Sequence, residues 1–252
     1  AALFGTVFDR AFADPLHFAT DPLARQWHLV QPAGAPPVRF CFSPHTDPDL
    51  SLGPVAAAID QATSSVFFAI AFLYQSSGAI REAVDRLMRK QVFSYGISDK
   101  RGGLQVRKPD GSIGLVDFAY LAGQAPEPFK TEWSGGPGIN QHHKFVVTDF
   151  SLPTARVFTG SSNLSPTGER GNGDHLVMIE DPRVATAYAI EALRVFDHLH
   201  FRSRMEDALV RDKRGDPLTL ARPTAISGKP PWFAAAYEPG HAAEADRRLF
   251  SR

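Results

Sequence analysis

The stretch from residue 142 to residue 163 holds the side chains best suited to chemistry on a charged substrate. It reads HHKFVVTDFSLPTARVFTGSSN and begins with the pattern H-x-K-x-x-x-x-D, whose fixed positions are His142, Lys144 and Asp149. In a β-strand, side chains two positions apart lie on the same face, so His142 and Lys144 are expected to point into one pocket. Phe145 and Val147 then face the opposite side, toward a core. Asp149 has the wrong parity for the pocket face, so we expect it at the strand end in a structural pairing.

A second pattern, G-S-x-N, follows a β-branched run at residues 156–159 and places Gly160, Ser161 and Asn163 shortly after the first pattern. Glycine lacks a Cβ, so Gly160 permits a sharp turn and a close approach of the backbone to a ligand. Imidazole, ammonium, hydroxyl and carboxamide groups together supply a nucleophile or acid and several hydrogen-bond donors. The two patterns therefore predict a site for a phosphate group, with Gly160 and Ser161 in substrate binding.

These residues resemble the HKD motif of the phospholipase D superfamily, because every fixed position of both patterns is present in the right order. The resemblance continues through GERGNGDHLVMI (residues 168–179), where family members carry an acidic residue before another strand. Asp174 stands at that place, and the resemblance implies that it accepts a hydrogen bond from the other ring nitrogen of His142. More loosely, the similarity covers residues 40–202.

The resemblance implies a metal-independent phosphodiester hydrolase that works through a phosphohistidine intermediate. Family members use two histidines from two motif copies, one as the nucleophile for phosphorus and one as the acid for the departing oxygen. The catalytic residues that it implies are His142, Lys144, Asn163 and Asp174. Lys144 and Asn163 would hold the phosphoryl oxygens. No metal or other cofactor is implied, because Lys144 and its counterpart in the second motif supply the positive charge.

The sequence contains one H-x-K pattern, and the adjacent His143 cannot supply a second, because neighbouring strand residues point to opposite faces. The working site is therefore expected to include a second motif, from an identical subunit across a two-fold axis or from a separate N-terminal half. In a homodimer the two copies of His142 share both roles, whereas in a C-terminal half the family pattern makes His142 the acid. VFDRAF (7–12) echoes VFDHLHF (195–201), and this is either a repeat or a likeness of two unrelated amphipathic helices.

The composition limits the substrate without deciding it. The 27 basic and 27 acidic residues give a formal net charge of zero, whereas nucleic-acid binders usually carry a basic surplus. A phospholipid is the favoured substrate, and a nuclease of the same fold and an inactive binding module are the alternatives. No apolar run approaches the ~20 residues that span a bilayer, and no signal peptide is visible, so we expect a soluble protein of undecided compartment. The single cysteine, Cys41, is expected in the core.

Alternating helical and strand patterns predict an α/β fold, and the resemblance makes it a phospholipase D-like mixed β-sheet flanked by helices on both faces. Helices are expected over residues 1–13, 50–62, 80–90 and from 181 to about 199. The last of these has an expected core face of Val184, Tyr188, Ala192, Val195 and Leu199. Strands are expected over residues 38–42, 65–73, 92–97, 142–148, 156–159 and 172–180. The run SVFFAIAFL (65–73) is apolar throughout, which is typical of a strand buried on both faces of a sheet.

The expected organisation is an N-terminal helix and Pro-rich linker (1–37), a catalytic domain with one motif (38–202) and a C-terminal extension (203–252). The middle segment, residues 98–141, is rich in Gly and Pro and contains a hairpin signal between 104–107 and 113–116. Basic residues between Arg101 and Lys108 are either solvated loop charges or part of a phosphate entrance, and Trp133 either packs on its loop or stacks on substrate. The histidines outside the motif have no partner at metal-ligand spacing, so a zinc site is not expected.

Overall fold

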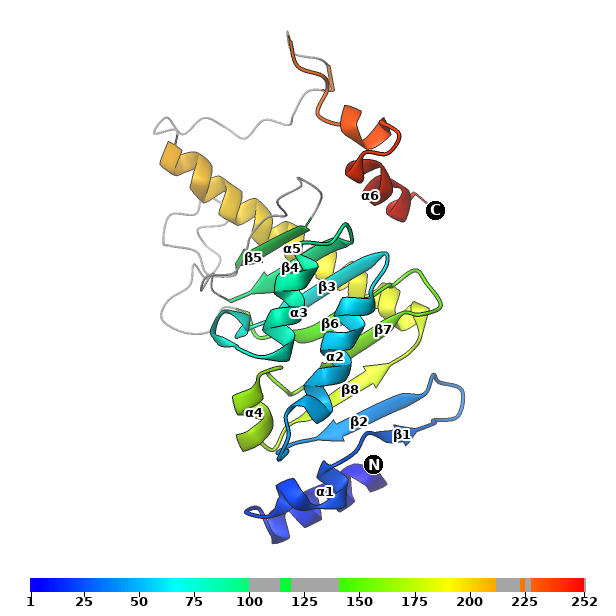
Figure 1. Cartoon of the computed structure of the whole chain (residues 1–252), viewed down its shortest axis with the longest axis vertical. Coiled ribbons are helices and arrows are strands. Elements are labelled where there is room, and N and C mark those ends of the chain that lie inside the picture. The colour runs from blue at the N-terminus through cyan, green and yellow to red at the C-terminus, as the bar shows by residue number, and fades with distance from the viewer. Residues whose placement is uncertain (100–113, 119–140, 212–222, 225–227, 252) are drawn as a thin grey trace.

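In this computed structural model, eight strands of the described residues form one β-sheet with helices on both of its faces (Figure 1). The structure describes residues 1–99, 114–118, 141–211, 223–224 and 228–251. The strands are β1 (His28–Val30), β2 (Val38–Phe42), β3 (Ser65–Ile70), β4 (Phe93–Ser98), β5 (Gly114–Phe118), β6 (Lys144–Thr148), β7 (Arg156–Gly160) and β8 (His175–Ile179). The α-helices are α1 (Ala2–Ala13), α2 (Asp49–Gln61), α3 (Ala79–Leu87), α4 (Pro166–Gly171), α5 (Pro182–Arg211) and α6 (Ala242–Phe250). Short 3₁₀ turns are η1 (Phe18–Thr20), η2 (Pro22–Ala24), η3 (Leu73–Gln75) and η4 (Ala234–Tyr237).

The strand order is β1-β2-β8-β7-β6-β3-β4-β5, and the sheet is mixed. Strands β3, β4 and β5 run parallel to one another, whereas every other neighbouring pair is antiparallel. The antiparallel pairing brings the end of β2, the start of β6, the end of β7 and the start of β8 to the same end of the sheet. Residues that are far apart in the sequence therefore meet at that end.

Two hydrophobic layers sandwich the sheet, as its strand patterns predict. On one face, Val66, Phe68 and Ile70 of β3 pack with apolar side chains of α2 and α3. On the other face, Phe67 and Ala69 pack with α5. All six residues of β3 are buried, because helices cover both faces of this strand. The predicted α/β/α architecture is confirmed.

Helix α5 begins where the sequence predicts, and its most buried side chains lie beside most of the predicted core positions, with Ala192 common to both. The Asp181 carboxylate accepts hydrogen bonds from the backbone N–H groups of Arg183 (2.8 Å) and Val184 (3.0 Å), which caps the first turn. Among the side chains described in α5, residues 182–197, the buried ones are Ala185, Ala189, Ala192 and Phe196, and the predicted core residue Leu199 lies outside that range. Of the predicted core face, Val184, Tyr188 and Val195 are only partly buried. Three alanines let the helix axis lie close to the sheet, so the larger residues beside them flank the contact instead of filling it.

The segment before Val38 contributes to the sheet, although its prolines suggested a linker. Strand β1 pairs antiparallel with β2, with His28 opposite Phe40. The indole N–H of Trp27 donates to the carbonyl of Leu50 at 2.9 Å, which ties this segment to α2. Since β1 lies before residue 38 and α5 continues past residue 202, the division at these two positions stays a prediction.

Two further expectations concern the middle segment and membranes. Most of the hairpin predicted at 104–116 lies outside the described residues, and its last three positions belong to β5, which pairs parallel with β4. Within the described part of the chain, no helix is long and apolar enough to cross a membrane.

Candidate active site

A pocket of about 800 Å³ opens at the end of the sheet where β6 begins and β7 ends. The strands supply its floor, and the first turns of α5 supply one wall. The lining residues are His142, His143, Lys144, Phe145, Thr159, Gly160, Ser161, Asn163, Asn172, Asp174, Ala187, Tyr188 and Glu191. Six of the seven residues nominated from the sequence thus come together in one cavity, and the seventh, Asp149, lies elsewhere.

His142 and Lys144 are in direct contact. Strand β6 begins at Lys144, so His142 lies just before the strand rather than within it. The Lys144 ammonium donates to Nε2 of His142 at 2.8 Å and to the His142 carbonyl at 3.1 Å. Because an ammonium group can only donate, Nε2 accepts, and the ring proton is on Nδ1. This tautomer leaves the lone pair of Nε2 on the side of the ring that faces Lys144.

The surroundings of Lys144 favour the loss of its proton. Partial burial lowers the pKa of Lys144 below its ordinary value, and the Asp174 carboxylate offsets part of that effect. Asp174 therefore acts electrostatically on Lys144. The hydrogen bond expected from the His142 ring to Asp174 is not formed in the described part of the chain. The backbone N–H of Asp174 instead donates to the Ser43 hydroxyl at 3.0 Å.

The turn after β7 carries the G-S-x-N residues. The Ser161 hydroxyl accepts from the backbone N–H of His175 at 3.0 Å and lies 3.1 Å from Nδ1 of the same residue. The side chain of Asn163 makes no hydrogen bond to the described residues, and its carbonyl oxygen is buried. A buried acceptor without a partner is uncommon in folded proteins, so this carboxamide is a candidate for binding a ligand, and its NH2 group is the part that can donate to a phosphoryl oxygen.

The backbone conformation at residue 160 requires glycine. Its φ of 142° is one that residues with a Cβ rarely adopt, and a Cβ built there would lie 2.3 Å from the His175 carbonyl oxygen. We expect Gly160→Ala to lower the free energy of unfolding by about 2 kcal/mol or more, from strain and the contact with a rigid backbone atom. Urea unfolding of the two proteins measures the difference.

The matched control for this substitution is Gly171→Ala at the end of α4, where a Cβ would meet nothing within 4 Å. It is expected to change the free energy of unfolding by less than about 1 kcal/mol. Equal stabilities of the two variants would contradict the requirement for glycine at residue 160.

Asp149 lies directly after β6 and is 4% exposed. Its carboxylate accepts hydrogen bonds from the backbone N–H groups of Thr63, Ser64 and Ser65 at 3.0, 2.8 and 3.3 Å. The hydroxyl of Thr154 lies 3.4 Å away. These contacts join the start of β3 to the end of β6, at the opposite end of the strand from His142.

Sequence reasoning missed several residues of the pocket. It also missed His175, which does not line the pocket but contacts the lining residue Ser161; its place directly after Asp174 in the chain was the available signal. Burial lowers the pKa of His175, and the Asp174 carboxylate offsets part of the shift. Tyr188 and Glu191 reach the pocket from α5, a placement that depends on how the helix crosses the sheet. The basic residues between Arg101 and Lys108 and the indole of Trp133 lie outside the described residues.

The polar side chains of the pocket differ from one another in kind. No group of three or more His, Cys, Asp or Glu side chains in the described part of the chain is arranged to hold a metal ion. The pocket instead combines an ammonium, an imidazole, a hydroxyl and a carboxamide. Such groups are suited to the oxygens of a phosphoryl group.

A model of the family described as "Cardiolipin synthase, PLD-like domain" matches residues 55–196, which is more than half of the chain. The chain belongs to the phospholipase D-like family. The matched region includes every pocket residue nominated from the sequence. Members of this family are in general phosphodiesterases or phosphotransferases, and they typically pair two HKD motifs. No curated protein matches the sequence.

Solved structures of other phospholipase D-like proteins are similar at low identity. Nuc from Salmonella typhimurium, a phospholipase D family member, is 20% identical, with 67% of this chain and 96% of that chain covered and a TM-score of 0.44. NucT from Helicobacter pylori is 18% identical, with coverages of 66% and 96% and a TM-score of 0.43. Phosphatidylserine synthase from Haemophilus influenzae is 14% identical, with coverages of 81% and 52% and a TM-score of 0.44.

Proposed function

We propose that this phospholipase D-like chain hydrolyses a phosphodiester through a phosphohistidine intermediate, with phospholipid as its substrate. The observation that carries the proposal is the 2.8 Å contact between the Lys144 ammonium and Nε2 of His142. A phosphoryl oxygen that took the place of the imidazole as acceptor for Lys144 would bring phosphorus next to a nucleophilic nitrogen. Ser161 and Asn163 line the same pocket and supply further donors for the phosphoryl oxygens.

The reaction divides into two displacements at phosphorus. The lone pair of one motif imidazole attacks phosphorus, the bond to the departing alcohol oxygen breaks, and a protonated second imidazole gives that oxygen a proton. Water then attacks phosphorus, the phosphorus–nitrogen bond breaks to free the first imidazole, and the proton of the water passes to the second imidazole. His142 is one of the two rings. Without the second ring, the alkoxide leaves unprotonated, which forfeits roughly 10²–10⁴-fold in rate.

The second motif comes from an identical subunit or from a separate N-terminal half. Helix α1 offers a surface for such a partner, since Phe8 is 67% and Phe12 is 80% exposed. In the similar sequence of α5 (195–201), the residue that corresponds to Phe8 is Phe196. It is 1% exposed and stacks on Tyr95 with ring centroids 4.0 Å apart. This contrast supports a partner that covers α1.

The mass in solution separates the two arrangements. An active species of twice the 27.5 kDa of one chain indicates an identical subunit. A chain of single mass that gains activity only with a second HKD-bearing unit indicates a separate half. A single chain that hydrolyses substrate by itself contradicts the paired site.

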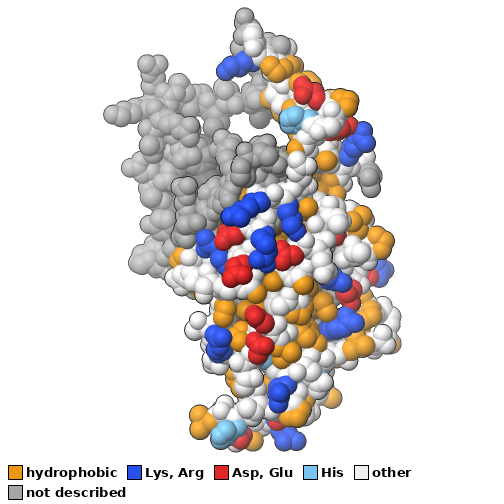
Figure 2. All heavy atoms as spheres, viewed as in Figure 1, with side chains coloured by type: hydrophobic (Ala, Val, Ile, Leu, Met, Phe, Trp, Pro, Cys, Tyr) orange, Lys and Arg blue, Asp and Glu red, His pale blue; other side chains and the backbone are white. Residues whose placement is uncertain are grey.

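The pocket lining favours a phospholipid over a nucleic acid. Two carboxylates, Asp174 and Glu191, line it beside the aromatic ring of Tyr188. This combination suits a cationic head group better than a polyanionic strand. Figure 2 shows acidic and basic side chains intermixed over the face that α2 and α3 cover. The ion pairs of these helices include Arg86–Asp60 and Arg81–Asp85.

A substrate panel tests the proposal. Phosphatidylcholine, single-stranded DNA and bis-p-nitrophenyl phosphate are each incubated with the protein in the presence of EDTA. Hydrolysis of phosphatidylcholine and of the chromogenic diester, without cleavage of DNA, is expected. Cleavage of DNA with a steep salt dependence would favour the nuclease. Loss of all activity with EDTA would contradict the metal-independent mechanism.

The alkaline side of the pH profile reports on Lys144. Lys144 must be protonated to bind a phosphoryl oxygen, so activity is present below its pKa and is lost above it. Because burial lowers that pKa, the decline is expected to begin at a lower pH than for an ordinary lysine. In Asp174→Asn the offsetting carboxylate charge is gone, so the pKa of Lys144 falls further and the decline moves to lower pH. A decline at the same pH in both proteins would contradict this coupling.

A further inference from the structure

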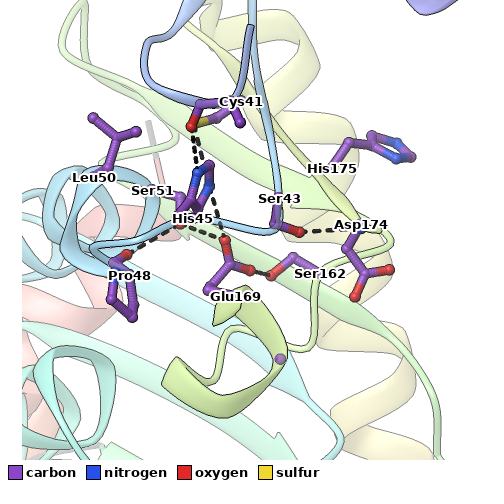
Figure 3. A network of polar contacts seen from close by, with 12 residues as sticks. Cys41, Ser43, His45, Pro48, Leu50, Ser51, Ser162, Glu169, Asp174 and His175 are labelled. Atoms are coloured by element: carbon purple, nitrogen blue, oxygen red, sulfur yellow. Dashed lines mark hydrogen bonds and ion pairs between the residues drawn. The ribbon is translucent and has the colours of Figure 1, made fainter. Parts of the chain in front are cut away.

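Behind the pocket, a buried polar cluster joins helix α4 to the segment that follows β2 (Figure 3). The Glu169 carboxylate of α4 accepts hydrogen bonds from the hydroxyls of Ser51 and Ser162 and pairs with the ring of His45. All four side chains are almost fully buried, with exposures between 0 and 2%. We call these four residues the Glu169 cluster. None of them is among the residues that line the pocket.

The Glu169 cluster places the ring of His45 between two oxygen acceptors. Nδ1 of His45 lies 2.6 Å from the Ala24 carbonyl oxygen, and Nε2 lies 3.3 Å from the Glu169 carboxylate. The Cys41 sulfur lies 3.6 Å from the same Nε2, so the ring is enclosed by polar neighbours on both sides. Burial raises the pKa of Glu169, but the bonds from His45, Ser162 and Ser51 outweigh it, and the pKa lies below its usual value. A buried carboxylate held by three donors has little freedom to move.

Ser162 connects the Glu169 cluster to the pocket. It lies between Ser161 and Asn163, and it is fully buried whereas its two neighbours line the pocket. Its hydroxyl donates to Glu169 and accepts from the backbone N–H of Leu164 at 3.0 Å. The side chain of Asn163 makes no hydrogen bond to the described residues, so the place of its carboxamide depends on the backbone that Ser162 anchors.

The segment that carries His45 also holds the other side of the pocket. The Ser43 hydroxyl donates to the Asn172 carbonyl at 2.9 Å and accepts from the Asp174 N–H at 3.0 Å. The Ser43 N–H donates to the Asp174 carbonyl at 3.0 Å, and the His45 N–H donates to the Glu169 carbonyl at 2.7 Å. Residues 43–45 thus bind both α4 and the pocket-lining residues Asn172 and Asp174.

We propose that Ser162 and Glu169 are positioning residues, which hold the Asn163 carboxamide where it meets a phosphoryl oxygen. They touch no substrate and act through Asn163. The catalytic consequence rests on the proposed function, whereas the positioning of Asn163 does not.

Kinetics with bis-p-nitrophenyl phosphate separate positioning from folding. Ser162→Ala removes the hydrogen bond from the loop after β7 to the Glu169 carboxylate. Ser51→Ala removes the hydrogen bond from α2 to the same carboxylate. The carboxylate oxygen that Ser51 contacts also pairs with His45, so Ser51→Ala leaves the bond to Ser162 intact. We expect Ser162→Ala to lower kcat by about 10–100-fold, and Ser51→Ala to lower it by less than about 3-fold. If the two variants lose kcat equally, in parallel with falls in their melting temperatures, the proposal is overturned.

A double-mutant cycle tests whether Ser162 acts through Asn163. If it does, the variant with both Ser162→Ala and Asn163→Ala loses no more activity than Asn163→Ala alone. Losses that multiply would mean that Ser162 acts independently, and they would overturn the proposal.

A measurement without turnover separates this inference from the proposed function. The side-chain amide signal of Asn163 in a ¹⁵N-labelled protein reports its surroundings directly. We expect the signal to move in Ser162→Ala and to stay in place in Ser51→Ala. An unmoved signal in Ser162→Ala overturns the positioning, whatever the kinetics show. If the wild-type protein hydrolyses no diester, the proposed function fails, and the amide signal still decides the positioning.

Discussion

Replacing His142 by asparagine is expected to lower hydrolysis of bis-p-nitrophenyl phosphate by about 10⁴-fold while the protein stays folded. The imidazole supplies either the nucleophilic nitrogen or the departing proton, and a carboxamide does neither at neutral pH. Asparagine retains a polar group of similar size at an exposed position, so little stability is lost. Initial rates at saturating substrate, with circular dichroism as the check on folding, measure the effect.

The control for this experiment is His17→Asn, which changes another exposed histidine, located between α1 and η1. Its rate is expected to equal that of the wild type within about twofold. If His142→Asn keeps most of its activity, the phosphohistidine mechanism is excluded. If His142→Asn does not fold, the same measurement is made on a second variant, His142→Gln.

The motif residues could be predicted from the sequence because local spacing specifies them. His142 and Lys144 are two residues apart, and a strand or an extended lead into one brings such side chains together. The run that became β3 was equally informative, since unbroken apolar sequence requires cover on both faces. In both cases the information lies within a few residues.

The Glu169 cluster could not be predicted for the opposite reason. Ser51 and Glu169 are 118 residues apart in the sequence, and nothing near either residue indicates the other. The same holds for β1, a three-residue strand whose stability comes from pairing with β2 and not from its own pattern. Most of the buried positions of α5 were missed because alanine carries a weak hydrophobic signal beside valine and tyrosine.

The partner of the His142 ring also depended on three-dimensional detail. The family pattern placed Asp174 against one ring nitrogen, but the described contacts include no such bond and place the Lys144 ammonium against Nε2. Spacing shows that three such groups can meet in one pocket. Which two of them form a hydrogen bond depends on differences of about an ångström in the turns before β6 and β8, and sequence patterns do not carry that information.

Replacing Lys144 by methionine separates the electrostatic contribution of the site from its folding. Lys144 is the one lysine or arginine among the described residues that line the pocket. Removing it is expected to lower kcat by about 10²–10³-fold, as for other single groups that stabilise charge in a transition state. Because burial lowers the pKa of Lys144, its charged form is held at a cost to stability, and methionine relieves that cost.

The melting temperature of Lys144→Met is therefore expected to stay within about 4 °C of the wild-type value, or to rise. Lys229→Met, at an exposed position far along the chain from the motif, serves as the control and should change neither quantity. A parallel fall of activity and melting temperature in Lys144→Met would mean that the ammonium holds the pocket together instead of binding the phosphoryl group. If Lys144→Met keeps its activity, the positive charge of Lys144 is not needed for the reaction. The proposed role of its contact with the His142 imidazole would then be contradicted.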